Sequence, residues 1–221
     1  PLLRDALLPF KYLPFTVVNL PNLISLSRVP LLFVVAVLVY LPLYFDIPGV
    51  ASLAFVVFVF SALTDWLDGF IARKFNRISD FGKLMDALSD KILMVGVFVV
   101  LLGAGLLPEW CVFFVLLIIG REFLITGMRL VAASQGKVLA AERGGKIKTV
   151  LQIASVCVAL FAYAVQKDFT AAGAEGDWLA QVAHPFLYWA GVVLFIAATW
   201  QTAVSGWSYL KKNREIFLEK A

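Results

Sequence analysis

Long runs of apolar residues alternate with short polar connections along the whole 221-residue chain. Each run has roughly the 20 residues that an α-helix needs to cross the hydrocarbon core of a bilayer. Proline, glycine and charged residues gather in the connections, where helices end. The pattern therefore predicts an all-α integral membrane protein with six transmembrane helices. These helices are expected over residues 23–45, 48–73, 83–107, 109–134, 146–166 and 184–210.

The composition supports a membrane protein. Hydrophobic residues make up 62% of the chain and charged residues only 15%, whereas about a quarter of the residues in average soluble domains are charged. No polar linker divides the chain, so we expect one six-helix domain over residues 21–215. Residues 1–20 mix Arg4, Asp5 and Lys11 with apolar residues. Such a mixture is typical of an amphipathic juxtamembrane segment on the membrane surface rather than of a signal peptide.

Basic residues are concentrated at one set of helix ends. The opposite connections contain Lys167 but are otherwise acidic. Because positive charge stays on the cytoplasmic side of a cell (inner) membrane, we expect both termini to face the cytoplasm. The net charge of +4 fits an enzyme that faces anionic lipid head groups, and no nucleic-acid partner is expected. The basic ends contain Arg4, Lys11, Arg28, Arg73, Lys74, Arg77, Lys83, Lys137, Arg143, Lys146, Lys148, Lys211, Lys212, Arg214 and Lys220.

Four aspartates occur in helical register within one polar stretch at the cytoplasmic ends of the second and third predicted helices. Asp65 and Asp68 are three residues apart, and Asp86 and Asp90 are four apart, so each pair lies on one face of its helix. The two pairs can face each other across the intervening turn, where Asp80 is expected to cap the next helix. Ionisable residues at this depth are costly and usually functional.

Three interpretations of these carboxylates compete. They can form salt bridges with neighbouring basic residues, serve as the proton or cation relay of a transporter, or bind divalent metal ions. Oxygen ligands suit Mg²⁺ or Mn²⁺, and such ions neutralise phosphates during phosphoryl transfer. Gly69 and Gly82 let a bulky ligand approach the backbone, Ala72 is also small, and Arg73 can bind a phosphate in bidentate fashion. These neighbours favour a two-metal site for a diphosphate.

The same stretch resembles the signature of a known family, the CDP-alcohol phosphatidyltransferases. Members of that family are membrane enzymes that join a CDP-linked lipid to a small alcohol and release CMP. The six-helix hydropathy pattern agrees with the family's fold, so the resemblance covers nearly the whole chain. The residues that match the fixed positions of the signature are Asp65, Asp68, Gly69, Ala72, Arg73, Gly82, Asp86 and Asp90.

The resemblance implies a role for each of these residues. Asp90 would be the general base that takes the proton of the acceptor hydroxyl, which then attacks the β-phosphoryl group. From the residues alone the base stays open, because spacing does not show which carboxylate reaches the nucleophile. The implied ligands of two divalent cations, Mg²⁺ or Mn²⁺, are Asp65, Asp68, Asp86 and Asp90. The implied contacts of the CDP-lipid are Asp68, Gly69, Ala72, Arg73 and Gly82, with Ser79 as a further candidate.

Charged residues also interrupt two later apolar runs. Arg121 and Arg129 are eight residues apart, about two helical turns, so they share a helix face. Lys146 and Lys148 lie just inside the start of the fifth predicted helix, where backbone N–H groups and the helix dipole attract anions. Each lysine alone can simply snorkel to water, and Glu122 can form a structural pair with Arg121. Together the four basic residues predict a phosphate pocket for a phosphorylated acceptor alcohol.

Three further runs look like one branch of the family, the bacterial phosphatidylglycerophosphate synthases; they are NLPNLISLSRV, GREFLITGMRL and GKIKT. This resemblance implies CDP-diacylglycerol as donor, glycerol 3-phosphate as acceptor and a homodimer in the lipid membrane. Asn22 and Arg28 would contact the diphosphate, although a helix cap explains Asn22 equally well. Two alternatives stay open: a sister transferase that uses inositol phosphate, and, from another class, a cation or proton-coupled transporter.

Overall fold

The structure is a computed structural model that describes residues 20–75, 80–134, 143–171 and 182–214, with the side chains of 27–63, 88–133, 145–168 and 182–214. The regular structure of the described residues is helical, without a β-strand, and includes six long helices. The predicted all-α fold is therefore confirmed, whereas the surface segment predicted for residues 1–20 lies almost wholly outside this part. The helices are α1 Leu20–Tyr44, α2 Val50–Phe75, α3 Asp80–Gly103, the short 3₁₀ helix η2 Glu109–Cys111, α4 Val112–Ser134, α5 Arg143–Ala171 and α6 His184–Lys212.

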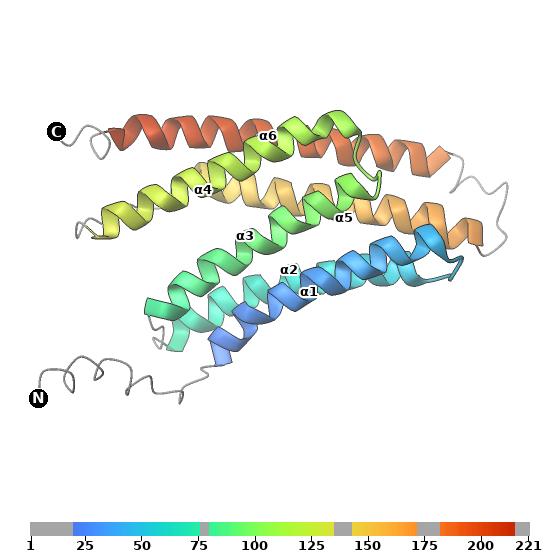
Figure 1. Ribbon diagram of the computed structural model, residues 1–221, viewed down its shortest axis with the longest axis horizontal. Helices are drawn as coiled ribbons and strands as arrows, with labels where there is room; N and C mark the ends of the chain where they lie inside the picture. Colours follow the sequence, from blue (N-terminus) through green and yellow to red (C-terminus); the bar gives the residue numbers. More distant parts are fainter. Residues whose placement is uncertain (1–19, 76–79, 135–142, 172–181, 215–221) are drawn as a thin grey trace, which may run out of the picture.

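The long helices form one bundle in which α5 is central (Figure 1). Helix α5 packs against α6 on one side and against α2 on the other, while α1 packs against α2 and α3. Helix α4 packs against α6 and α3. Helices α3 and α4 are close near the connection that joins them, and they diverge toward the end where α2 ends and α3 begins (Figure 1). This divergence leaves room for a site between α3, α4 and α5.

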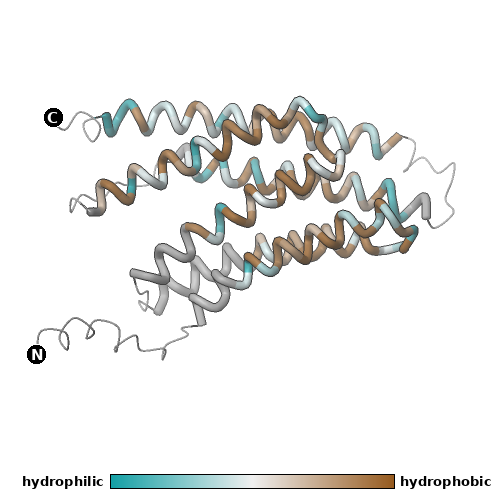
Figure 2. Tube along the Cα trace, viewed as in Figure 1, coloured by the Kyte–Doolittle hydropathy of each residue, from teal (hydrophilic) through white to brown (hydrophobic). Residues whose placement is uncertain are grey.

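Hydrophobic residues predominate along much of the helices (Figure 2). Apolar side chains lie on the outside of the bundle as well as in its core. Large exposed aromatic residues on a helical bundle are stable against lipid but not against water, so the chain is a multi-pass membrane protein. The buried core includes Val35, Phe58, Phe98, Leu160 and Phe195. Stretches long and apolar enough to span a membrane are Ser27–Tyr44, Glu109–Ala133, Gly145–Asp168 and His184–Lys212, and α2 contributes the shorter apolar stretch Val50–Leu63.

Helix α3 ends earlier than the apolar pattern predicts. The sequence predicts a third helix as far as residue 107, but α3 ends at Gly103. Gly105 adopts a φ of 72°, its N–H donates to the Leu102 carbonyl at 3.1 Å, and the Leu106 N–H donates to the Leu101 carbonyl at 2.9 Å. This is the Schellman arrangement, which requires a left-handed residue and which glycine adopts without a steric penalty. The backbone preference of one glycine therefore stops the helix within an apolar run.

A carboxylate near the end of α5 caps the beginning of α2. Asp168 Oδ1 accepts a hydrogen bond from the Gly49 N–H at 3.0 Å, and Oδ2 accepts one from the Ser52 N–H at 2.7 Å. The Ser52 hydroxyl also donates to Oδ2. The first N–H groups of a helix have no partners within the helix, and negative charge there is favoured by the helix dipole. Asp168 therefore fixes α2 to α5 across more than a hundred residues of sequence.

Replacing Asp168 by Ala is expected to destabilise the folded protein by about 1–2 kcal/mol, as for other lost helix caps. The substitution leaves two backbone N–H groups at the start of α2 without acceptors. Thermal unfolding of the purified protein in detergent measures the effect as a lower Tm. The control is Asp46→Ala, which removes an exposed acid from the same end of the bundle. An equal decrease in Tm for both variants would contradict the capping role.

Candidate active site

The backbone of the aspartate stretch is helical, as the spacing predicts. Asp65 and Asp68 belong to α2, and Asp86 and Asp90 belong to α3. Helix α3 begins at Asp80. Spacings of three and four within continuous helices place each pair on one helix face. Among the four, only the Asp90 side chain lies in the described part of the chain.

The rest of the predicted donor site falls largely outside the described side chains. Residue 79 is outside the described backbone as well. Arg28 is described: its side chain is buried, and it does not line the cavity in which Asp90 lies. The predicted donor-site and metal-site residues with undescribed side chains are Asn22, Asp65, Asp68, Gly69, Ala72, Arg73, Ser79, Gly82 and Asp86.

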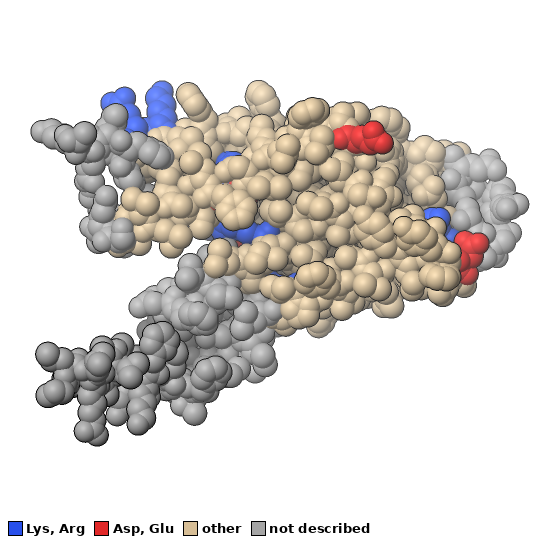
Figure 3. Space-filling view, in the orientation of Figure 1, with Lys and Arg blue, Asp and Glu red and all other residues tan. Residues whose placement is uncertain are grey.

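A cavity of about 440 Å³ lies between α3, α4 and α5, with Ala62 of α2 at its edge. Figure 3 shows Lys and Arg side chains gathered in a recess of the surface in this region. A volume of this size accommodates a small charged molecule. Its charged and hydroxyl-bearing lining consists of Asp90, Lys91, Arg121, Glu122, Thr126, Arg129, Lys146, Lys148 and Thr149.

All four residues of the predicted phosphate pocket line this one cavity. Arg121 and Arg129 come from α4, and Lys146 and Lys148 come from the first turns of α5. Asp90 of α3 lines the same cavity. The structure therefore brings the predicted basic residues together with the carboxylate predicted to act as the base. Cations, the start of a helix and a carboxylate together suit a substrate that carries both a phosphate and a reactive hydroxyl.

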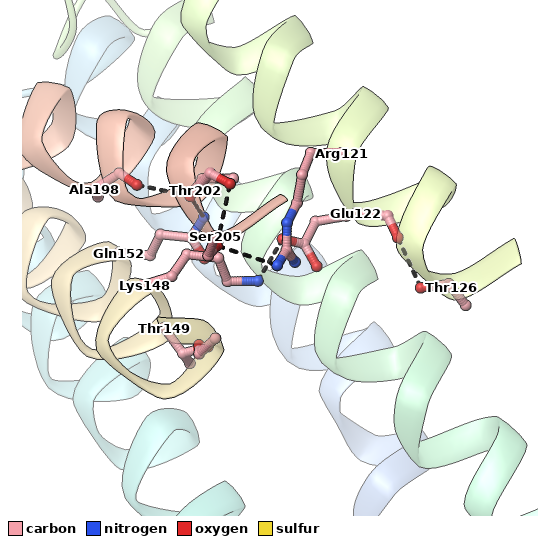
Figure 4. Close-up of polar contacts among 10 residues, drawn as sticks. Arg121, Glu122, Thr126, Lys148, Thr149, Gln152, Ala198, Thr202 and Ser205 are labelled. Atoms are coloured by element: carbon pink, nitrogen blue, oxygen red, sulfur yellow. Dashed lines mark hydrogen bonds and ion pairs between the residues drawn. The ribbon is translucent and has the colours of Figure 1, made fainter. Parts of the chain in front are cut away.

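Glu122 connects two of these cations. Its carboxylate forms ion pairs with Lys148 and, at 3.2 Å between Oε1 and Nη1, with Arg121, and Figure 4 shows the three side chains together. Glu122 and Lys148 are both buried. The structural pair between Glu122 and Arg121, left open by the sequence, is thus present, but Glu122 also bridges α4 to α5. One negative charge for two positive charges leaves this part of the cavity with net positive charge.

Sequence reasoning missed several polar residues of the site. Thr126 and Thr149 line the cavity, and each hydroxyl donates to a carbonyl of its own helix, those of Glu122 at 2.7 Å and Gly145 at 3.2 Å. Helical spacing could have identified Thr126, because a residue four positions after Glu122 and three before Arg129 lies on the same helix face as both. Thr149 has the same kind of signal, three residues after Lys146.

Among the described side chains, His, Cys, Asp and Glu form no group of three or more that would hold a metal ion. Because three of the four predicted aspartate ligands lie outside this part, the metal site stays a prediction. Asp90 is the one member whose side chain is placed, and it lines the charged cavity.

The fold and the cavity together define a class of protein: a multi-pass helical membrane protein with a charged cavity between its helices. A sequence model of the CDP-alcohol phosphatidyltransferase family matches residues 18–197. The chain therefore belongs to the CDP-alcohol phosphatidyltransferase family, and it is a transferase.

Curated relatives support this assignment over nearly their full lengths. A protein of Bacillus subtilis is 37% identical over 207 residues, which are 89% of this chain and 96% of the relative. Proteins of Rickettsia felis and Salmonella choleraesuis are each 30% identical, over 90% and 91% of this chain and 97% and 98% of their own lengths. All three are named CDP-diacylglycerol–glycerol-3-phosphate 3-phosphatidyltransferase.

The buried pair between Glu122 and Lys148 is expected to show strong coupling in a double-mutant cycle. Removing either partner leaves a buried charge without its counter-charge, which costs about 3–5 kcal/mol in comparable cases. Glu122→Ala combined with Lys148→Ala should therefore destabilise the protein by less than the sum of the single changes, in thermal unfolding of the detergent-solubilised protein.

The matched control for this cycle is Lys146→Ala, because Lys146 is an exposed lysine two residues before Lys148 on the same helix. Its effect should add to that of Glu122→Ala within about 0.5 kcal/mol. Additive effects for the Glu122 and Lys148 pair would contradict the proposed coupling.

Proposed function

We propose that this protein transfers the phosphatidyl group of CDP-diacylglycerol to glycerol 3-phosphate, giving phosphatidylglycerophosphate and CMP. The observation that carries the proposal is the cavity in which Asp90 lies with five basic side chains, including all four of the predicted phosphate pocket. The names of relatives that align with about nine-tenths of the chain support the same reaction. The signature in α2 and α3 supports a CDP-lipid as the donor.

The acceptor in this proposal binds through its phosphate. Glycerol 3-phosphate carries two negative charges at neutral pH, and Arg121, Arg129, Lys146 and Lys148 supply positive charge around the cavity. Arginine forms two parallel hydrogen bonds to a phosphate, whereas lysine acts as a point charge. Lys146 and Lys148 are also near the N-terminus of α5, where the helix dipole adds to the attraction for an anion.

The donor binds beside the acceptor, along the cytoplasmic ends of α2 and α3. In this proposal Asp68, Gly69, Ala72, Arg73 and Gly82 frame the CDP group. Ser79, Asn22 and Arg28 make further contacts. The connection between α2 and α3 has only four residues, so the two helix ends that carry the signature are within about 18 Å of each other.

Enzymes of this family generally depend on divalent cations. We propose that Asp65, Asp68, Asp86 and Asp90 bind two such ions, Mg²⁺ or Mn²⁺. The chemistry of the donor set supports this, because carboxylate oxygens suit hard divalent ions, and because one of the four, Asp90, lines the charged cavity. When bound, the ions would neutralise the charge of the diphosphate.

Asp90 is the general base of the proposed reaction. Its carboxylate takes the proton of the acceptor hydroxyl, directly or through one water. The hydroxyl oxygen then forms a bond to the β-phosphorus of the CDP-lipid while the bond between that phosphorus and the bridging oxygen of CMP breaks. The four cations orient the acceptor by its phosphate, so that the hydroxyl rather than the phosphate meets the donor.

The membrane separates the routes of the two substrates. The lipid chains of the donor enter sideways from the inner leaflet, and the water-soluble acceptor enters from the cytoplasm. The concentration of basic residues at one set of helix ends supports a cytoplasmic site in the cell (inner) membrane. The resemblance to the family supports a homodimer.

Purified protein in detergent, given CDP-diacylglycerol, Mg²⁺ and glycerol 3-phosphate, is expected to release CMP and phosphatidylglycerophosphate in equal amounts. Chelation with EDTA should abolish both products, and readdition of Mg²⁺ or Mn²⁺ should restore them. Inositol phosphate as the acceptor is the control and should give no CMP. The opposite acceptor preference would contradict the proposed acceptor. Ion accumulation in sealed vesicles without any CMP release would instead indicate a transporter.

Asp90→Asn is expected to reduce kcat by about 10²–10⁴-fold, because the amide cannot accept the proton of the acceptor hydroxyl. Binding of CDP-diacylglycerol, measured by isothermal titration in detergent, should stay largely intact. The control is Asp46→Asn at the opposite end of the bundle, which should leave both quantities unchanged. Loss of donor binding along with turnover would mean that Asp90 is an essential ligand rather than the base.

A further inference from the structure

Helix α6 contacts both arginines of the cavity without lining it. Ser205, Gly206 and Tyr209 occupy one face of α6, and none of them belongs to the cavity wall. Arg121 and Arg129 approach this face from α4, two turns apart. Helix α6 therefore contacts two side chains that line a cavity between α3, α4 and α5.

Ser205 presents an oxygen to Arg121. The Nη2 group of Arg121 donates a hydrogen bond to Ser205 Oγ at 3.2 Å, as Figure 4 shows. The Ser205 hydroxyl itself donates to the Thr202 carbonyl at 3.1 Å, which orients the oxygen so that a lone pair can accept from arginine. Ser205 is buried. Since Arg121 also pairs with Glu122, its guanidinium is fixed from two sides.

The polar layer behind Ser205 continues into α5. Gln152 donates from Nε2 to Thr202 Oγ1 at 3.3 Å, and the Thr202 hydroxyl donates to the Ala198 carbonyl at 2.6 Å. Gln152 and Thr202 are both buried. Buried polar groups with partners rigidify their surroundings, so the backbone that carries Ser205 is held against α5.

Gly206 provides the space in which the stem of Arg121 lies. A Cβ atom added at Gly206 would lie 2.8 Å from Cγ and 3.3 Å from Nε of Arg121. The first distance is shorter than carbon atoms tolerate without a shift. Glycine in a helix interior lowers helix stability relative to alanine. The close approach of the Arg121 side chain explains why α6 has a glycine at this position.

Tyr209 holds the second arginine. Arg129 Nε donates to the Tyr209 hydroxyl at 3.2 Å, and the guanidinium carbon lies 5.4 Å from the centre of the ring. Tyr209 is buried and packs against Ile125 and Met128. A hydrogen bond and a cation–π contact to one rigid ring restrict the rotamers available to Arg129.

We propose that this face of α6, formed by Ser205, Gly206 and Tyr209, positions Arg121 and Arg129 for the phosphate of the acceptor. The inference rests on the proposed function and adds residues to it. Arginine side chains lose rotamer freedom when they bind an anion, and side chains fixed in advance bind it more tightly. The three residues are positioning residues, since they act on the substrate only through the arginines.

The test is Gly206→Ala, which adds one methyl group at the stem of Arg121. The KM for glycerol 3-phosphate should rise about tenfold, which corresponds to a modest loss of binding, while the KM for CDP-diacylglycerol and kcat stay within about twofold. The matched control is Gly191→Ala on the same helix, where the added Cβ would make ordinary contacts with Ala159, the shortest at 3.4 Å. This control should leave all three constants unchanged.

Arg121→Ala separates failure of the inference from failure of the proposed function. If Arg121→Ala leaves the KM for glycerol 3-phosphate unchanged, Arg121 does not bind the acceptor and the proposed pocket is wrong. If Arg121→Ala raises this KM and Gly206→Ala does not, the positioning role of α6 is wrong. If both raise it, Gly206→Ala should have no further effect in the Arg121→Ala background, and an additive effect would overturn the inference.

Ser205→Ala provides the same test should Gly206→Ala fail to fold. It removes one oxygen and should raise the KM for glycerol 3-phosphate but not that for the donor. Ser205→Thr keeps a hydroxyl and should restore the value of the unchanged protein. Tyr209→Phe, which keeps the ring and removes the hydroxyl, should show the same selective rise. Equal effects on both substrates would mean that α6 only supports the fold.

Discussion

A single buried carboxylate, Glu122, makes the charged cavity possible inside a lipid-embedded bundle. A charge removed from water is costly unless it is paired, and Lys148 is almost wholly enclosed. Glu122 pairs with Lys148 and with Arg121, and it thereby joins α4 to α5. Without it, the two cations would repel each other in surroundings that screen charge poorly.

The sequence predicts the fold because length and helical periodicity are properties of single segments. The six predicted apolar runs correspond to six long helices, four of which contain a described stretch long and apolar enough to span a membrane. The eight-residue spacing of Arg121 and Arg129 does place both in one cavity. The sequence indicated Arg121 as a partner of Glu122 but not Lys148, since Lys148 comes from another helix and this pairing depends on how α4 packs beside α5. Ser205 and Gly206 were missed for a related reason: small residues in an apolar run are ordinary in membrane helices.

The two ends of the bundle are stabilised by different means. At one end Asp168 caps α2, and Gly105 stops α3 in a Schellman turn. Both devices give backbone N–H groups an acceptor, a side-chain carboxylate in the first case and backbone carbonyls in the second. Toward the other end α3 and α4 diverge (Figure 1), and the ion pair between Glu122 and Lys148 links α4 to α5. The helices are held together at one end of the bundle and diverge toward the other. This arrangement leaves room for substrates in the proposed site and keeps the helices at a fixed spacing.

The sharing of Glu122 also bears on turnover. Before an anion arrives, the carboxylate already occupies part of the hydrogen-bonding capacity of Arg121 and Lys148, so an incoming phosphate competes with a resident partner. In the proposed reaction, this competition lowers the affinity for the acceptor. The lipid product of the proposed reaction retains the phosphate of the acceptor. A site that bound this phosphate with unpaired cations would release the product slowly. In the proposed reaction, competition from Glu122 therefore favours release of the lipid product into the bilayer, after which the carboxylate pairs again with Arg121 and Lys148.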